Sequence, residues 1–359
     1  MSKVTDIQVS AVKLFFLEAP MRVPLKFGGE TICSCSVARV NLQVTGRDGK
    51  SARGWGESVL SPGWAWPAPC SFAERDGFMK EFCVKLAEAW NCFKYTGHPM
   101  EIGHEFLQTR LDTLLEKANA GRDIPMPHLA ALNCEAAFDL ALHDAYGVLH
   151  NVPVYDTYTA EWMNHDLSHY LEPNAPHVDF HGRYPSDYLV RDVPQTLPVW
   201  HLVGGKDLLS ESERTGGEPD DGYPVVLDEW ITVDGLKCLK IKLRGNDSAW
   251  DYQRLIDVGR IALERGVHWL SPDFNCLVTD PKYVNDILDK LVREHPAIYG
   301  KILYVEQPFP YDLENNRIDV HSVSARKPLF MDESCHDWRF VRMGRALGWT
   351  GVALKTCKT

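Results

Sequence analysis

The most constraining feature of this 359-residue sequence is a series of five short apolar runs in its second half, each ending at a charged residue. The runs end at Lys242, Asp273, Glu306, Asp332 and Lys355. Successive charges are 31, 33, 26 and 23 residues apart, and each spacing accommodates one helix, two loops and one strand. Such a repeat is typical of a β/α barrel, in which the carboxyl ends of the parallel strands meet at one rim and carry the chemistry. The sequence therefore predicts that these five charges converge.

The first half of the chain has a different pattern. Apolar residues alternate around Ile7–Leu14 and Val37–Val44, and Asp48-Gly49 supplies the positive-φ residues of a hairpin turn. Apolar residues at helical spacing follow, most regularly over 129–141. We therefore expect an N-terminal α+β domain built from an antiparallel meander and helices.

These patterns predict an α/β chain with three parts. Residues 1–156 form the α+β domain, residues 157–196 are an insertion rich in proline and polar side chains, and residues 197–359 form a partial (β/α) TIM-type barrel. A closed barrel has eight strands, and the sequence ends after the sixth strand that we expect. We therefore expect a barrel truncated after about six strands, with open edges that either a partner, such as a second copy in a homo-oligomer, or the missing segment would shield.

Composition narrows the class of partner. The sequence is 45% hydrophobic and 24% charged, as is usual for a globular enzyme. Its net charge of -11 argues against nucleic-acid binding, and no segment has the features of a signal peptide or membrane span. Ten scattered cysteines favour free thiols over a disulfide framework. We expect a cytoplasmic protein that acts on a small molecule and binds neither nucleic acid nor membrane.

The strand-end residues predict a cation site flanked by bases. Three carboxylates offer the oxygen-only ligation that Mg²⁺ prefers. Lys240 and Lys242 lie two residues apart, so both point to the same face of a strand, and one face of a barrel strand is interior. Taken singly, each residue has a simpler explanation, since an Asp after a strand is more often the cap of the next helix. Glu333 is an alternative to Asp332 as ligand, and Lys358 is an alternative to Lys355.

The order of these segments resembles the enolase superfamily. Lys-x-Lys, Asp-x-Asn, Val-Glu-Gln-Pro, Asp-Glu-Ser and Leu-Lys occur in the family order, and Gly54-Trp55-Gly56-Glu57 is similar to a segment of the family's capping domain. Within the superfamily the chain resembles the mandelate racemase/muconate lactonizing enzyme family, and most closely the muconate-lactonizing and dipeptide-epimerase branch because of its strand-end lysines. The resemblance covers residues 1–156 and 197–359.

This resemblance implies a fold and a set of roles. The N-terminal domain would be the capping domain of a TIM-type barrel. Asp273, Glu306 and Asp332 would ligate Mg²⁺, while Lys242 and Lys355 would face each other across the substrate carbon. Lys240 would assist, because a neighbouring ammonium group disfavours the charged form of a lysine base. The implied reaction is abstraction of the α-proton of a carboxylate through an enediolate, giving racemisation, epimerisation or cycloisomerisation.

Other functions stay open from the sequence. An acid-sugar dehydratase or another syn-elimination lyase of the superfamily would need one lysine only. A Schiff-base aldolase would use Lys242 or Lys355 as nucleophile but leaves the carboxylates without a role. A truncated, catalytically inactive member would serve as a binding module. The histidines of the insertion match no defined metal pattern. His143 and Asp144 are expected to be packing and capping groups. Met21–Glu30 is interpreted as a loop over the barrel mouth.

Overall fold

The computed structural model describes residues 2–27, 30–173 and 175–358. The chain divides into two compact units, one made of Met1–Ala19 and Cys35–Pro194 and the other of Pro20–Ser34 and Gln195–Thr359. Each unit has its own cluster of buried apolar side chains. The bounds 1–156, 157–196 and 197–359 stay predictions.

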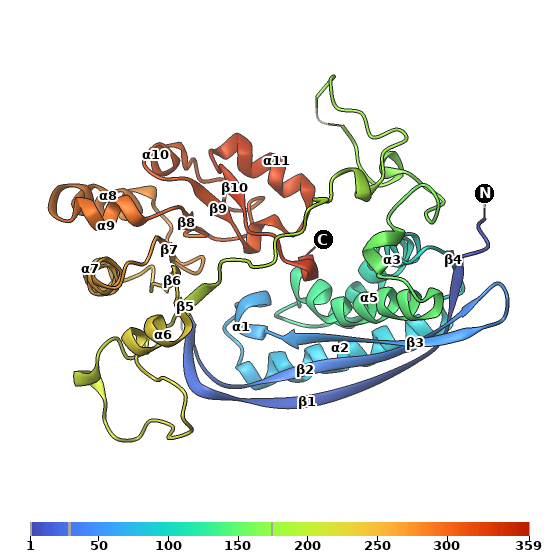
Figure 1. Cartoon of the computed structure of the whole chain (residues 1–359), viewed down its shortest axis with the longest axis horizontal. Coiled ribbons are helices and arrows are strands. Elements are labelled where there is room, and N and C mark those ends of the chain that lie inside the picture. Colours follow the sequence, from blue (N-terminus) through green and yellow to red (C-terminus); the bar gives the residue numbers. More distant parts are fainter. Residues whose placement is uncertain (1, 28–29, 174, 359) are drawn as a thin grey trace. The chain divides into compact units, whose positions relative to one another are not determined.

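The first unit is built on an antiparallel sheet with the strand order β3-β2-β1-β4 (Figure 1). The strands are β1 (Ile7–Phe27), β2 (Glu30–Gly46), β3 (Ser51–Leu60) and β4 (Thr96–Gly97). The end of β1 and the start of β2 fall in the segment Pro20–Ser34, which belongs to the second unit. Its helices are α1 (Pro62–Ala65), α2 (Phe72–Cys92), α3 (Pro99–Phe106), α4 (Asp112–Asn119) and α5 (His128–His150), and a π-helical segment, Leu107–Leu111, joins α3 to α4. The predicted α+β domain is thereby confirmed.

The predicted hairpin turn lies between β2 and β3. Gly49 has a φ of 82°, and its amide donates to the carbonyl of Gly46 at 3.0 Å. The turn sets the strand register, in which Thr45 pairs with Ser51 and Val40 with Gly56. Strand β3 consequently presents alternate residues to opposite faces of the sheet.

Helix α5 packs directly onto the inner face of β3. Gly54 and Gly56 lie on that face, and a Cβ added to Gly56 would stand 2.1 Å from the carbonyl oxygen of Ala137. A Cβ on Gly54 would stand 2.1 Å from the amide nitrogen of Ala145. Only glycine therefore allows this approach of strand and helix, while Trp55 between them faces outward and is 53% exposed. The two glycines of the Gly-Trp-Gly segment therefore allow β3 and α5 to pack in direct backbone contact.

The second unit contains a six-stranded parallel sheet in the order β10-β9-β8-β7-β6-β5 (Figure 1). Its strands are β5 (Trp200–Val203), β6 (Cys238–Lys242), β7 (Trp269–Asp273), β8 (Val305–Glu306), β9 (Leu329–Met331) and β10 (Gly351–Val352). The helices that alternate with them are α6 (Leu227–Asp234), α7 (Ser248–Glu264), α8 (Pro281–Glu294), α9 (Pro296–Lys301), α10 (His321–Ser324) and α11 (Trp338–Leu347). The predicted α/β class and the six parallel strands of a TIM-type barrel are confirmed.

Local sequence signals account for the helix starts of this unit. Asp247 caps α7 by accepting from the amide of Trp250, and Asp280 caps α8 by accepting from the amide of Lys282. Pro281 occupies the first turn of α8, where no backbone donor is needed. In the described part of 157–196 the only regular elements are 3₁₀ turns, such as Leu167–His169.

The loop predicted for Met21–Glu30 is wrong for its described residues. Strand β1 continues to Phe27 and β2 begins at Glu30, while Gly28 and Gly29 lie outside the described residues. Arg22 helps to hold this part of β1 in place, because its guanidinium contacts both carboxylate oxygens of Asp221 at 2.6 Å and the carbonyl of Pro224 at 2.9 Å.

Among the described residues, no helix combines the length and apolarity that a membrane crossing demands.

Candidate active site

The register of the parallel sheet brings the predicted charges together. Lys242 is paired with Asp273 across β6 and β7, and Asp273 is paired with Glu306 across β7 and β8. Asp332 follows β9 directly, and Lys355 follows β10. The five residues therefore lie at the carboxyl ends of consecutive strands, as the sequence predicted.

Lysines from β6 neutralise the first two carboxylates. The ammonium nitrogen of Lys242 contacts Asp273 Oδ2 at 2.5 Å and Asn275 Oδ1 at 2.9 Å. Lys240 bridges the two acids, since its Nζ pairs with Glu306 and lies 3.1 Å from Asp273 Oδ2. Lys242, Asp273 and Glu306 are buried, so this charge network is held away from water.

Two further lysines hold Asp332. Lys355 donates to Asp332 Oδ2 at 2.6 Å, and Lys358 donates to Oδ1 at 2.8 Å. Lys358 also donates to the main-chain carbonyls of Asp332 and Ala353 at 2.6 and 2.7 Å, and its Nζ lies 3.1 Å from Cys335 Sγ. The Lys358 side chain is fully buried, whereas that of Lys355 is 37% exposed. Lys355 is therefore the lysine of this pair that is exposed to solvent.

Gln307 braces the turn that carries Asp332. Its side-chain oxygen accepts from the amides of Asp332 at 2.7 Å and Ser334 at 3.2 Å. Its side-chain nitrogen donates to the Phe309 carbonyl at 2.9 Å and to Ser334 Oγ at 2.7 Å. The residue is fully buried and has a φ of 31°. Gln307 is the glutamine of the Val-Glu-Gln-Pro motif, but the sequence analysis assigned it no role. Its position directly after the strand-end acid Glu306 is the signal that could have indicated one.

Opposing effects set the protonation of the network. Burial would lower the pKa of Lys240, but the carboxylates of Asp273 and Glu306 outweigh it and raise that pKa above the ordinary value. Burial raises the pKa of Glu306 to about 7, and the Asp273 carboxylate adds to this rise. Burial would also raise the pKa of Asp332, but the ammonium groups of Lys355 and Lys358 hold it well below its usual range. Lys240 is therefore a stable cation of this site.

Glu333 is a fourth acid at this rim. It begins the 3₁₀ turn Glu333–Cys335 that follows β9, and it is buried. Burial and the carboxylates of Asp332 and Asp273 raise the pKa of Glu333 to about 8. Among the described residues, its Oε2 has no hydrogen-bond partner.

The donor set fits a hard divalent cation by its chemistry. Asp273, Glu306 and Asp332 supply carboxylate oxygens only, as Mg²⁺ prefers. The ammonium group of Lys240 lies against both Asp273 and Glu306, so a positive charge already bridges two of these acids. Within the described ranges, no three His, Cys, Asp or Glu side chains are arranged to hold a metal ion. Binding of a cation would therefore require the lysine contacts to rearrange.

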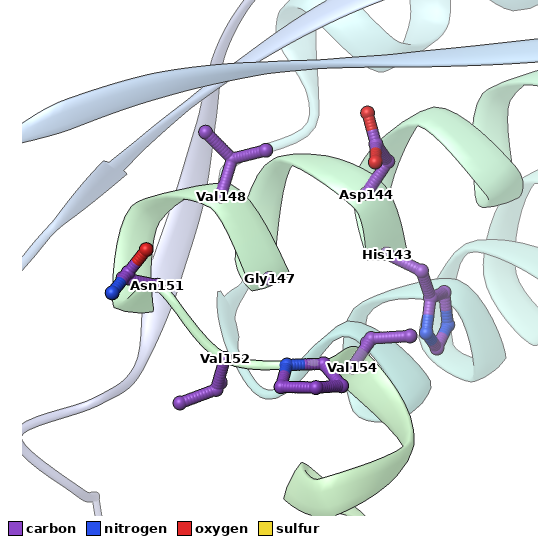
Figure 2. A pocket seen from close by; sticks show the side chains of 8 residues that line it. His143, Asp144, Gly147, Val148, Asn151, Val152 and Val154 are labelled. Atoms are coloured by element: carbon purple, nitrogen blue, oxygen red, sulfur yellow. The ribbon is translucent and has the colours of Figure 1, made fainter.

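A cavity of about 510 Å³ lies at the end of α5 in the first unit (Figure 2). Figure 2 shows His143 and Asp144 at adjacent positions of the helix, with side chains that point in different directions. Asp144 accepts from the amide of Trp55 at 2.8 Å, and His143 Nδ1 lies 2.9 Å from the hydroxyl of Tyr158. Both residues have structural partners, in agreement with the packing roles predicted for them.

Comparison with known proteins finds similarity to solved structures. No family model and no curated protein matches the sequence. Among solved structures, a mandelate racemase/muconate lactonizing protein from Herpetosiphon aurantiacus is 16% identical, with a TM-score of 0.57 over 99% of this chain and 76% of that one. An N-succinyl Arg/Lys racemase from Bacillus cereus is 18% identical, with a TM-score of 0.59 over 98% of this chain and 73% of that one.

A third structure comes from the branch that the sequence resembles most. A dipeptide epimerase from Enterococcus faecalis, solved with Mg and the dipeptide L-Leu-L-Tyr, is 15% identical, with a TM-score of 0.56 over 98% of this chain and 75% of that one. These similarities confirm the resemblance at the level of the fold. The chain therefore shares its fold with these solved structures, namely a mandelate racemase/muconate lactonizing protein, an N-succinyl Arg/Lys racemase and a dipeptide epimerase.

Proposed function

We propose that this protein is a Mg²⁺-dependent enzyme that removes the α-proton of a carboxylate substrate and returns a proton to the same carbon or rearranges the resulting enediolate. The supporting observation is the placement of lysines on both flanks of a row of acids. Lys240 and Lys242 extend from β6, Lys355 follows β10, and the acids end the strands between them. A bound divalent cation would supply positive charge to stabilise the enediolate.

Formal charge supports a neutral lysine as the base. With every group ionised, the charges of Lys240, Lys242, Lys355 and Lys358 cancel those of Asp273, Glu306, Asp332 and Glu333. A divalent cation and a substrate carboxylate together add one positive charge. Loss of one lysine proton removes that excess, so binding of both partners favours a neutral lysine.

The contacts distinguish the roles of the lysines. Lys240 lies against two acids that keep it protonated, so it serves as a fixed cation near the substrate. Lys242, from the same face of β6, is the base on that side. Lys355 is the acid or base on the other side, because Lys358 is buried and bound to main-chain carbonyls.

Bases on two sides favour racemisation, epimerisation or cycloisomerisation over elimination, for which one base is enough. The Mg-complexed dipeptide epimerase that shares this fold supports both the cation and the reaction type. We place the enzyme in the cytoplasm, since all ten cysteines are free, as is typical of reducing compartments.

The proposal is tested by solvent-deuterium incorporation at the α-carbon of carboxylate substrates. A library of dipeptides, N-acylamino acids and sugar acids is incubated in deuterium oxide with Mg²⁺, and then with EDTA. Exchange that depends on Mg²⁺ and occurs from both stereoisomers of one substrate is expected. Exchange that persists in EDTA, or its absence in protein shown to be folded, would refute the proposal.

The variant Glu306→Gln tests the metal assignment. The amide keeps the shape of the side chain but removes the charge, so metal-dependent exchange should be lost while the far-UV circular dichroism spectrum is retained. Exposed Glu314 is a matched control, because Glu314→Gln removes the same charge away from the site. Full exchange by Glu306→Gln would exclude Glu306 as a ligand.

A further inference from the structure

Histidine rings are concentrated where residues 157–170 lie against helices α3 and α5 of the first unit. Four histidines on the helix side contact this segment, and the segment carries two of its own. Beyond short 3₁₀ turns the segment has no regular structure, so side-chain contacts hold it in place. The six histidines are His98 and His104 on α3 and its cap, His143 and His150 on α5, and His165 and His169 of the segment.

His98 is fixed in its neutral form by the hydrogen bonds of both ring nitrogens. Its Nδ1 lies 3.3 Å from the amide of Met100, which caps α3, and can only accept there. Its Nε2 lies 3.0 Å from Thr157 Oγ1, whose own hydroxyl donates to the carbonyl of Val154, so Nε2 is the donor. A second proton on Nδ1 would point at an amide hydrogen and break the cap. Burial is the main reason that the pKa of His98 is about 3.

The other rings lie close to one another. His165 stacks on His169 with the ring centroids 4.1 Å apart, and His169 lies 5.8 Å from His104. The ring of His98 lies 6.5 Å from that of His143. Two protonated rings at such distances repel each other, and they do so more strongly where water is partly excluded. Protonation of the docked segment is therefore opposed in both groups of rings.

Acidic groups near these rings do not offset the burial. Glu105 raises the pKa of His104, yet burial and the neighbouring His169 outweigh it and lower that pKa. Asp48 and a main-chain carbonyl raise the pKa of His150, yet burial outweighs them as well. Both histidines therefore bind a proton more readily when they are exposed than when the segment covers them.

Glu101 anchors the segment to α3. Its Oε1 accepts from the amide of His165 at 3.1 Å, and its Oε2 accepts from the side-chain amide of Asn164 at 2.7 Å and from the amide of His98 at 2.9 Å. These donors engage both oxygens, so the acid holds main chain and amide groups instead of an imidazole. The other charged or titratable neighbours of the six rings are Lys3, Asp139, Tyr146, Tyr158, Asp166 and Tyr170.

We propose that residues 157–170 are a pH-sensitive latch, which stays docked on α3 and α5 while the six imidazoles are neutral and detaches locally when they are protonated below about pH 6. The detached segment exposes the rings to water, where each binds a proton at its ordinary pKa. Protons therefore favour the open form by linkage. Detachment would free the stretch of chain that leads from α5 toward β5. The latch does not depend on the proposed function.

The test is hydrogen–deuterium exchange of the full chain, followed by mass spectrometry at about pH 7 and about pH 5, with rates corrected for intrinsic exchange. Peptides from 157–170 are compared with peptides from α2, in the absence and presence of low urea concentrations. His98→Asn and His104→Gln are compared with wild type, and His104→Gln leaves the cap of α3 intact. His321→Gln is the matched control, because it removes an exposed imidazole of the second unit.

Protection of 157–170 is expected to fall about tenfold or more between these two pH values, because one histidine with a lowered pKa contributes up to tenfold per pH unit. Its exchange at about pH 5 should respond little to urea, since a local opening exposes little surface, whereas exchange of α2 should respond strongly. Both test variants should reduce the pH effect, and His321→Gln should keep it. Protection that does not change with pH would overturn the latch, as would a urea response equal to that of α2 or a full pH effect in both test variants.

Discussion

Replacing Gly56 with alanine is expected to separate strand β3 from helix α5. The new Cβ would lie 2.1 Å from the carbonyl oxygen of Ala137 and 2.5 Å from the amide nitrogen of Ala141, while ordinary contacts begin at 3.4 Å. Both obstacles are helix backbone, so no side chain can turn aside. The strand or the helix must therefore move by more than 1 Å.

The cost follows from what this movement disturbs. Overpacking of a tight interior costs about 1–3 kcal/mol. The shift would also stretch the hydrogen bonds that join Ser58 to the carbonyl and side-chain amide of Asn133, now 2.8 and 3.0 Å long, and each contributes about 1 kcal/mol. We therefore expect Gly56→Ala to lower the free energy of unfolding of the first unit by about 3–5 kcal/mol.

Gly77 provides a control with the same chemical change. It lies within helix α2, and a Cβ there meets no atom of the described residues within 4 Å. Gly77→Ala should stabilise the unit by about 1 kcal/mol, because alanine is the better helix former. Urea denaturation combined with hydrogen exchange in β3 and α5 measures both variants. Gly56→Ala with unchanged stability would refute the steric argument, and so would equal effects of the two substitutions.

Four further variants test other parts of the structure. Burial and the neighbouring His143 and His150 lower the pKa of His98 to about 3, below its value in the unfolded state. The unfolded state therefore binds the extra proton between these two pKa values. The free energy of unfolding should consequently fall by about 1.4 kcal/mol per pH unit as the pH drops from about 6.5 toward 3. His98→Asn, which keeps an acceptor for the Met100 amide, should flatten this dependence in urea melts, and an unchanged slope would contradict the assignment. Gln307→Met removes four hydrogen bonds and should lower the free energy of unfolding of the second unit by about 2–4 kcal/mol. It should also weaken Mn²⁺ binding. Melting at the wild-type temperature would argue against the bracing role of Gln307. Lys358→Met should cost about 3–5 kcal/mol because Asp332 loses a fully buried partner. Lys355→Met removes a partner that is 37% exposed, so it should cost less stability and lose deuterium exchange from one substrate stereoisomer. A reversal of these effects would exchange the two roles.

Features that depend on local chemistry were predictable from the sequence. Asp247 and Asp280 cap the helices that follow them, and such a cap is made within three residues of its own position. The turn at Asp48-Gly49 was predictable because glycine readily adopts the positive φ that Gly49 has in the structure. The strand-end charges were also found, because each apolar run ends where its strand meets the rim.

Features that depend on distant partners were not predictable. The segment Met21–Phe27 was interpreted as a loop, yet it continues β1, and Arg22 is held by an acid 199 residues away in the sequence. The burial of Lys358 and the unpartnered oxygen of Glu333 depend on how several strands meet. No local pattern separates Asp332 from Glu333 or Lys355 from Lys358, because each pair follows the same strand.

The pairing of Lys242 with Asp273 and of Asp273 with Glu306 also bears on how the sheet reaches its register. Side chains alternate along a strand, so a slip by one residue would turn these charges from the interior of the rim toward the apolar layer under the helices. Such a sheet would contain charges without counter-ions and would be strongly disfavoured. The strand-end charges thus also favour the observed register, since only the correctly aligned sheet pairs Lys242 with Asp273 and Asp273 with Glu306.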